Sequence, residues 1–211
     1  MKAILIEDRV NRQKNILGRK LDELTQFTFL KNISGGKDFE ELNQKLNNKE
    51  YTVLDEYSLI MLHRSAFETN TRNGIIEHLK KSNKKVVFFS GGITSCQFNK
   101  IDSLDFLLIN VNQFYSENLF CFLNNNGDNL LALAFGNQWQ TSILIDVYEK
   151  IVIHAKSFER KPFAKIDSEI IFNSWIIQKF FKDYAQNDII EKSELESILE
   201  KIKKELDNIL L

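Results

Sequence analysis

The chain has 211 residues, of which 43% are hydrophobic and 17 are phenylalanines, so it can bury a substantial core. A formal net charge of −1 gives no indication of a polyanionic partner, and two cysteines predict neither a disulfide framework nor a metal cluster. The N-terminal apolar run is too short for a signal peptide, and no stretch reaches the ~18 apolar residues of a membrane span. We therefore expect a cytoplasmic protein that binds neither nucleic acid nor a membrane.

Short apolar runs alternate with amphipathic segments in the first half of the chain, which is typical of a sheet covered by helices on both faces. The predicted strands span residues 2–6, 26–30, 57–62, 86–89 and 104–109. The predicted helices span residues 9–24, 38–46, 73–82 and 114–123. With right-handed crossovers, this order predicts an α/β fold with a five-stranded parallel flavodoxin-like sheet of order 2-1-3-4-5.

An asparagine-rich turn over residues 124–129 has no apolar anchor and predicts a domain boundary. We therefore expect one domain over 1–126 and a second, α-helical domain over 127–211. Helical apolar spacing recurs over 141–158, 167–185 and 193–211. The aromatic-rich segment 167–185 can be the core of a helical bundle or a docking surface. The last segment offers a seam for a homodimer.

In KAILIEDRVNRQKNIL, an expected strand delivers the acidic pair Glu7 and Asp8 into an expected helix. This opening resembles that of the receiver domain of response regulators, and the resemblance implies that Glu7 and Asp8 occupy the positions that bind magnesium in that family. In VVFFSGG, Ser90 occupies the place of the hydroxyl residue that contacts the phosphoryl group. The resemblance covers about the first 125 residues and implies a receiver-like fold with a site at the ends of its strands.

Two departures from the receiver pattern concern the phosphorylation chemistry itself. The phosphoacceptor aspartate should end the third strand, where YSLIMLHRS places His63 between Leu62 and Arg64. The lysine that should end the fifth strand is replaced in LLINVNQF by a stretch that contains Asn112. The resemblance therefore implies a pseudo-receiver that has lost aspartyl phosphorylation.

The residues at the expected strand ends allow two interpretations. Glu7 and Asp8 can hold a metal such as magnesium, or they can stabilise the start of the first helix. His63 and Arg64 can contact an anion at the carboxyl end of a central strand. Alternatively, Arg64 pairs with Glu7 or Asp8 and replaces the metal by an internal salt bridge, which is the interpretation we favour.

The segment SGGITS follows the fourth strand and resembles the SGGxDS phosphate loop of ATP pyrophosphatases. Its candidate ligand-binding residues are Ser90, Gly91, Gly92, Thr94 and Ser95. Glycines let backbone N–H groups approach a phosphate, and a following helix would add its dipole. Thr94 stands in place of the aspartate, however. The alternative is a tight turn that requires unusual backbone angles.

These observations favour a non-catalytic signalling or regulatory module that works through a protein partner and needs no cofactor. A ligand-sensing module is the alternative, and it would bind a nucleotide or another anion through Glu7, His63, Arg64, the SGGITS loop and Asn112. An enzyme of ATP-pyrophosphatase type is the third hypothesis.

Overall fold

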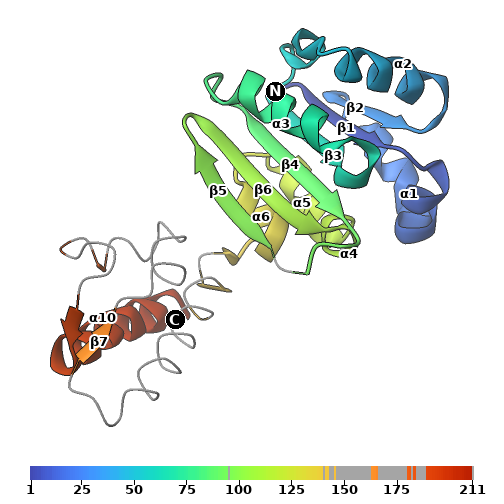
Figure 1. Ribbon diagram of the computed structural model, residues 1–211. Helices are drawn as coiled ribbons and strands as arrows, with labels where there is room; N and C mark the ends of the chain where they lie inside the picture. The colour runs from blue at the N-terminus through green and yellow to red at the C-terminus, as the bar shows by residue number, and fades with distance from the viewer. Residues whose placement is uncertain are drawn as a thin grey trace. The chain divides into compact units, whose positions relative to one another are not determined.

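The computed structural model describes residues 1–94, 96–139, 141–142, 145, 163–165, 180–181, 183 and 189–210. The chain forms two compact units, Met1–Asn137 and Gln138–Leu211. Within the first unit, a twisted sheet carries helices on both faces (Figure 1). No helix in the described part of the chain is both long enough and apolar enough to cross a membrane.

The elements of the first unit alternate between strands and helices for most of their length. In chain order they are β1 (Ala3–Glu7), α1 (Val10–Leu17), the 3-10 helix η1 (Gly18–Gln26), β2 (Leu30–Ser34), α2 (Gly36–Asn47), η2 (Tyr51–Leu54), β3 (Leu59–His63), η3 (Arg64–Ala66), α3 (Thr69–Leu79), β4 (Lys85–Ser90), β5 (Gln97–Ile101), β6 (Leu104–Asn110), α4 (Val111–Phe114), α5 (Glu117–Asn124) and α6 (Leu130–Phe135).

The sheet has six strands in the order β2-β1-β3-β4-β6-β5. All neighbouring strands are parallel except β5, which runs antiparallel to β6. Every residue of β1 and β3 is buried, as expected for central strands covered on both faces. The predicted α/β class with a mostly parallel, flavodoxin-like sheet is thus confirmed, whereas the predicted count of five strands and their order are wrong.

The additional strand is β5, and it occupies an edge of the sheet. Only six residues separate β4 from β5, which is too few for a helical crossover to a parallel neighbour. The chain instead runs along the edge and returns to β6 through a tight turn, in which Asp102 adopts a positive φ of 53°. β5 is therefore the additional strand, and it takes the place of a crossover helix. The strand that was predicted as the fifth, residues 104–109, corresponds to β6.

The predicted second strand, 26–30, is displaced along the chain. Residues up to Gln26 continue α1 as the 3-10 helix η1, and β2 begins only at Leu30. Phe27 and Phe29 are partly buried and pack against the core from the connection between η1 and β2. Their apolar character therefore reflects burial at a turn rather than a strand.

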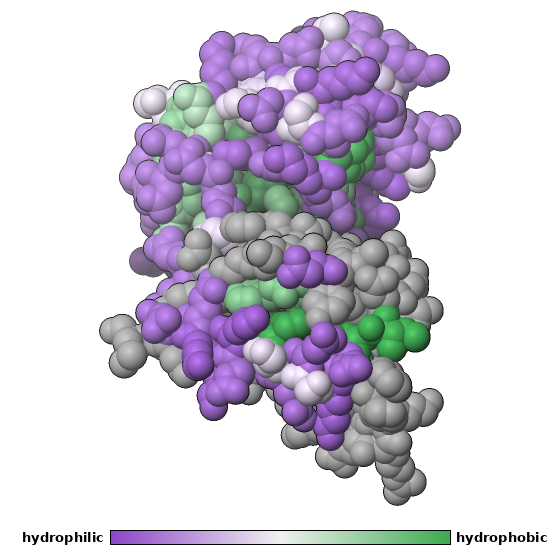
Figure 2. Space-filling model, turned by 90° about the vertical axis from the view of Figure 1, so that its left-hand side faces the viewer, coloured by the Kyte–Doolittle hydropathy of each residue, from purple (hydrophilic) through white to green (hydrophobic). Residues whose placement is uncertain are grey.

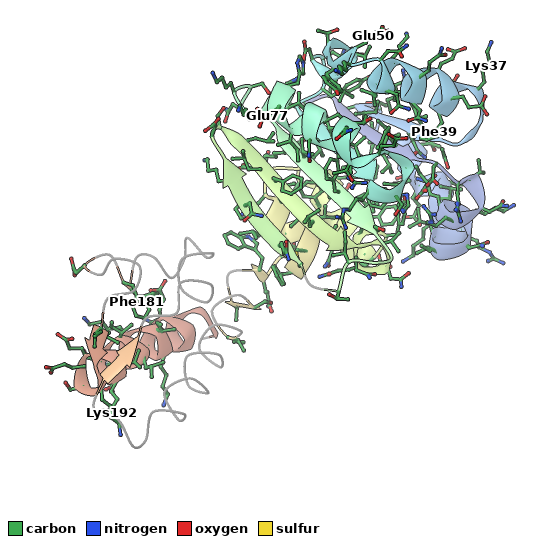
Figure 3. All side chains as sticks on the ribbon, viewed as in Figure 1. Lys37, Phe39, Glu50, Glu77, Phe181 and Lys192 are labelled. Atoms are coloured by element: carbon green, nitrogen blue, oxygen red, sulfur yellow. The ribbon has the colours of Figure 1, made fainter. Side chains whose placement is uncertain are left out.

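Two apolar layers pack against the two faces of the sheet, because side chains alternate between the faces along each strand. Helices α1, α4, α5 and α6 cover one face, and α2 and α3 cover the other (Figure 1). Side chains fill the space between these helices and the sheet, while Lys37 and Glu50 extend into solvent (Figure 3). On the face of the molecule seen in Figure 2, the surface of the first unit is mainly hydrophilic.

The first unit extends past the boundary expected at residue 126. Leu130 and Leu133 of α6 are buried in the same core layer as α4 and α5. The asparagine-rich turn is also anchored, since the backbone N–H of Gly127 donates to the carbonyl of Phe122 at 2.8 Å and Lys85 donates to the Gly127 carbonyl at 2.9 Å. This turn thus connects two helices of one unit, which ends at Asn137.

The second unit contains strands as well as a helix, in contrast to the expected helical domain. β7 (Phe163–Lys165) pairs antiparallel with β8 (Ile189–Glu191), which leads into α10 (Lys192–Leu210). Leu195, Ile198 and Ile202 of α10 are buried. A homodimer through the C-terminal segment stays a prediction. Most of the segments 141–158 and 167–185 lies outside the described residues.

Candidate functional site

Five parallel strands end at the same edge of the first unit's sheet, and each ends in a polar residue. These residues are Ser34 of β2, Glu7 of β1, His63 of β3, Ser90 of β4 and Asn110 of β6. The register pairs Ile6 with Leu62, which makes the following residues Glu7 and His63 lateral neighbours. Ligands of open α/β sheets bind at this edge, so it is the first place to look for a functional site.

Arg12 of α1 neutralises the acidic pair from inside the domain. Its Nη1 donates to Glu7 Oε1 at 2.5 Å and to Asp8 Oδ1 at 2.8 Å. Glu7 is fully buried, and only about a fifth of the Arg12 side chain is exposed. Asp8 precedes Arg12 by four residues, so the first turn of α1 places this guanidinium against both carboxylates.

The predicted internal salt bridge therefore involves a different arginine. Arg64 is exposed, and its backbone carbonyl accepts a hydrogen bond from Arg72 at 3.1 Å. Residue 63 ends β3 with its side chain in the buried cluster, whereas residue 64 begins the 3-10 helix η3 and is exposed. Replacement of a metal by an internal cation was expected, but Arg64 as its source was wrong.

His63 also lies close to both residues of the acidic pair. Its side chain is 3% exposed, and its Nδ1 lies 2.9 Å from Asp8 Oδ1 and 3.9 Å from Glu7 Oε1. The contact with Asp8 does not have the geometry of a hydrogen bond, so this buried nitrogen has no hydrogen-bond partner. The imidazole ring also packs on Phe89, with ring centroids 5.5 Å apart.

The other oxygen of Glu7 connects the cluster to a residue that is distant in sequence. Tyr115, which follows α4, donates its hydroxyl to Glu7 Oε2 at 3.3 Å. The backbone N–H of Arg9 donates to Glu7 Oε1 at 3.2 Å. Glu7 thus has polar partners from the start of α1 and from the connection between α4 and α5, which explains how a carboxyl group is tolerated at 0% exposure.

Burial and mutual contact set the protonation states of the cluster. Burial raises the pKa of Glu7 to about 7, and a hydrogen bond to Asp8 acts in the same direction. Burial would also raise the pKa of Asp8, but hydrogen bonding to Glu7 and the charges around it lower that pKa overall. Burial, assisted by Arg12, lowers the pKa of His63 to about 4. At neutral pH the cluster therefore contains a neutral imidazole, an ionised Asp8 and a positive Arg12.

Glu7, Asp8 and His63 together have the donor atoms of a metal site. One ligand atom from each lies within 4.8 Å of the others. Carboxylate oxygens and a neutral imidazole suit divalent transition metals, so the residue types fit. Arg12 already contacts both carboxylates, and a metal ion would have to displace it.

The SGGITS loop does not join this cluster. The hydroxyl of Ser90 shares a hydrogen bond of 3.1 Å with Ser65, and Asn110 Nδ2 donates to the carbonyl of Ile93 at 2.8 Å. The loop leads into strand β5 rather than into a helix, so the helix dipole that a phosphate loop would use is missing here. Thr94 is exposed, and Ser95 lies outside the described residues.

Asn112, another candidate from the sequence, also lies apart from the acidic cluster. It is exposed in α4, and its backbone N–H donates to Asn110 Oδ1 at 2.9 Å. Asn110 therefore fixes both the SGGITS loop and the start of α4. Its position at the end of β6 was the available sequence clue to this role.

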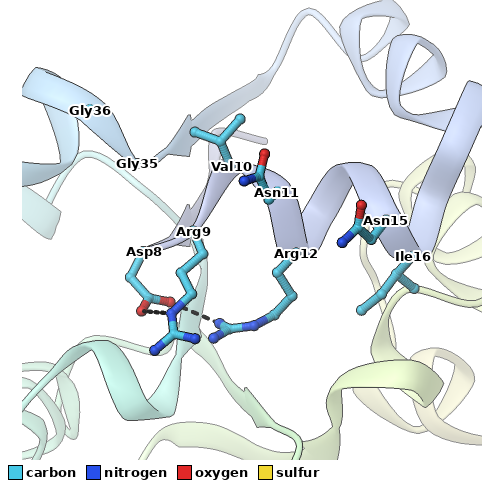
Figure 4. A pocket seen from close by; sticks show the side chains of 9 residues that line it. All are labelled: Asp8, Arg9, Val10, Asn11, Arg12, Asn15, Ile16, Gly35 and Gly36. Carbon is cyan, nitrogen blue, oxygen red and sulfur yellow. Dashed lines mark hydrogen bonds and ion pairs between the residues drawn. The ribbon is translucent and has the colours of Figure 1, made fainter.

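An open concavity of about 620 Å³ borders the cluster, and we call it the α1 groove. Asp8, Arg9 and Arg12 converge on one side of it, whereas Val10 and Asn11 project on another (Figure 4). The rest of its lining is Asn15, Ile16, Gly35 and Gly36. The groove gives solvent access to Asp8 and Arg12 but leaves Glu7 and His63 behind them.

No protein-family model, curated protein or solved structure matches the chain. The resemblance to receiver domains therefore stays a prediction that depends on the residues quoted for it.

Substitution of Gly92 by alanine tests whether the SGGITS loop needs this glycine for folding. Its φ lies outside the positive range, and a Cβ would meet nothing within 4 Å, so the expected unusual backbone angles are not found there. Gly92→Ala should raise the free energy of unfolding by about 0.5 kcal/mol, because alanine has less freedom in the unfolded chain. Urea denaturation measures this change.

Gly35→Ala is the matched control for that substitution. Gly35 has a φ of +57°, and a Cβ there would lie 2.9 Å from Cγ2 of Val10. It should lower the free energy of unfolding by about 2 kcal/mol. A loss in Gly92→Ala as large as that in Gly35→Ala would show that the loop requires a glycine-specific conformation after all.

Proposed function

We propose that the chain is a non-catalytic regulatory module, a phosphorylation-independent pseudo-receiver that acts through protein–protein contacts. The observation that supports this most directly is the guanidinium of Arg12 against Glu7 and Asp8, at 2.5 and 2.8 Å. A built-in cation at the acidic pair removes the need for the magnesium ion on which receiver chemistry depends.

The chemistry at the neighbouring strand ends supports the same proposal. In a receiver-like site, the phosphoacceptor carboxylate would end β3, where His63 stands. The charge-compensating lysine would end β6, where the chain has Asn110 followed by Val111. Without these groups, transfer of a phosphoryl group to an aspartate has neither an acceptor nor its usual charge compensation.

The α1 groove is the surface through which we expect a partner to bind. Arg9 is 73% exposed at its side chain and Val10 is 49% exposed, so a charged donor and an apolar contact stand side by side. Arginine is enriched in protein–protein interfaces, where it combines hydrogen bonding with apolar contact area. A partner segment that carries carboxylates would match the donors around Val10.

Treatment with acetyl phosphate or with magnesium and beryllofluoride tests the proposed function. We expect no incorporated phosphate by intact-mass spectrometry and no rise in melting temperature with beryllofluoride. Phosphate on His63 would contradict the proposal, and so would stabilisation that requires beryllofluoride. A ligand at a hundredfold its Kd stabilises by roughly 2.7 kcal/mol, so the thermal arm of this experiment is sensitive.

A nucleotide- or anion-sensing module is the second candidate function, and the exposed guanidinium of Arg9 favours it. The anion would bind in the α1 groove rather than at the SGGITS loop. ATP and pyrophosphate should then raise the melting temperature, and Arg9→Gln should abolish the rise. Unchanged melting temperatures with both anions would exclude this candidate.

A further inference from the structure

We propose that Glu7, Asp8 and His63 bind a divalent transition-metal ion that displaces the guanidinium of Arg12. This inference deepens the proposed function by naming a ligand that regulates the module. It rests on that function in one respect, namely that the cluster is not a phosphorylation site.

The main observation behind this inference is a buried nitrogen of His63 that has no hydrogen-bond partner. Nδ1 belongs to a side chain that is 3% exposed, it has no hydrogen-bond partner, and it lies 2.9 Å from Asp8 Oδ1. The short contact with Asp8 does not provide this nitrogen with a well-formed hydrogen bond. A metal ion bound to both atoms would give the nitrogen a partner.

The spacing of the donors is compatible with one ion. Metal–ligand distances of about 2.1 Å place neighbouring ligand atoms about 3.0–3.4 Å apart. The two observed separations from His63 Nδ1, 2.9 Å to Asp8 Oδ1 and 3.9 Å to Glu7 Oε1, lie on either side of that range. Binding of one ion to all three residues therefore requires movement of the Glu7 and Asp8 side chains.

Arg12 is the group that must move, and the structure gives it a place to go. Its side chain lines the α1 groove beside Asp8, so it can leave the acidic pair by turning into solvent (Figure 4). The same movement opens the entry path for the ion. Arg12 and the metal thus compete for one position between the carboxylates.

The imidazole ligand defines the class of metal. Magnesium takes oxygen ligands and holds its waters tightly, whereas cobalt, zinc and manganese accept a mixed set of imidazole and carboxylates. The site we infer should therefore prefer Co²⁺ to Mg²⁺. That order distinguishes it from an oxygen-only site at the acidic pair.

Calorimetric titration with Co²⁺, read in parallel by visible absorption, tests the inference on the full-length protein. Wild type should bind one Co²⁺ ion, H63Q should bind it at least about tenfold more weakly, and R12Q at least about tenfold more tightly. H78Q is the matched control, because exposed His78 also contacts a carboxylate, Asp55, at 2.7 Å. Its affinity for Co²⁺ should equal that of wild type.

Each contrary outcome overturns a defined part of the inference. Unchanged affinity in H63Q overturns imidazole ligation, and Mg²⁺ binding as tight as that of Co²⁺ does the same. Binding by R12Q alone, or by neither protein at millimolar Co²⁺, overturns displacement of Arg12 by metal. Comparison of wild type with H63Q decides the ligand assignment even if R12Q does not fold. Absence of Co²⁺ binding leaves the beryllofluoride result unaffected, so the two proposals fail separately.

Discussion

Replacing Arg12 by glutamine should lower the free energy of unfolding by about 1 kcal/mol at pH 6 and by about 3 kcal/mol at pH 9. At the lower pH, Glu7 is mostly protonated in the folded protein, because its pKa is about 7. Loss of the guanidinium then removes hydrogen bonds and the pair with Asp8. At the higher pH, Glu7 is ionised against Arg12 in wild type. In R12Q this carboxyl must stay unpaired or keep a proton that the unfolded chain releases.

The control for this prediction is R64Q, since Arg64 is the exposed arginine next to the same strand end. Its free energy of unfolding should stay within about 0.5 kcal/mol of wild type at both pH values. Urea denaturation followed by circular dichroism measures all three proteins. An equal loss in R12Q at both pH values would contradict the raised pKa of Glu7. A loss in R64Q that matched R12Q would contradict Arg12 as the internal cation.

The acidic pair and its neutralisation could be predicted from the sequence, but the identity of the cation could not be read from adjacency alone. Arg64 follows the strand directly, yet it begins the 3-10 helix η3 and is exposed. Arg12 lies within the predicted first helix, where a charged residue is usually solvated. Its spacing of four residues from Asp8 was the clue, because such a pair shares one side of a helix.

The fold could be predicted where burial determines the sequence pattern. β1, β3, β4 and β6 are apolar runs, and their observed bounds differ from the expected ones by no more than two residues. β5 was missed because an edge strand needs few apolar residues, and Gln97, Asn99 and Lys100 are exposed. α6 was assigned to the second domain because the polar turn before it looked like a linker. That turn is held by backbone contacts that composition does not reveal.

Contacts between distant parts of the chain lie beyond what spacing can predict. Tyr115 and Glu7 are separated by 108 residues, and no local pattern connects them. The partnership exists because β1 and the connection after α4 end at the same edge of the sheet. The α1 groove has the same origin, since Gly35 and Gly36 reach it only through the pairing of β2 with β1.

Glu7 and His63 should have opposite effects on stability between pH 4.5 and 6.5, so the metal-free wild type should show little dependence on pH from this cluster. The pKa of Glu7 is raised from 4.5 to about 7. Its contribution is therefore fully present below pH 4.5 and is lost as the pH rises towards 7. The pKa of His63 is lowered from 6.5 to about 4. Its contribution is present above pH 6.5 and is lost as the pH falls towards 4. Each amounts to about 3 kcal/mol, so the two slopes nearly cancel.

Single isosteric substitutions should expose the two slopes. Of these two groups, only Glu7 remains in H63Q. The free energy of unfolding of this variant should therefore fall by about 3 kcal/mol between pH 4.5 and 7. In E7Q only His63 remains, and the free energy of unfolding should rise by about 3 kcal/mol between pH 4 and 6.5. Urea denaturation in the presence of a chelator, repeated across the range, measures both. Flat profiles in both variants would mean that water reaches Glu7 and His63, and the buried cluster would then have to be reassigned as a solvated one.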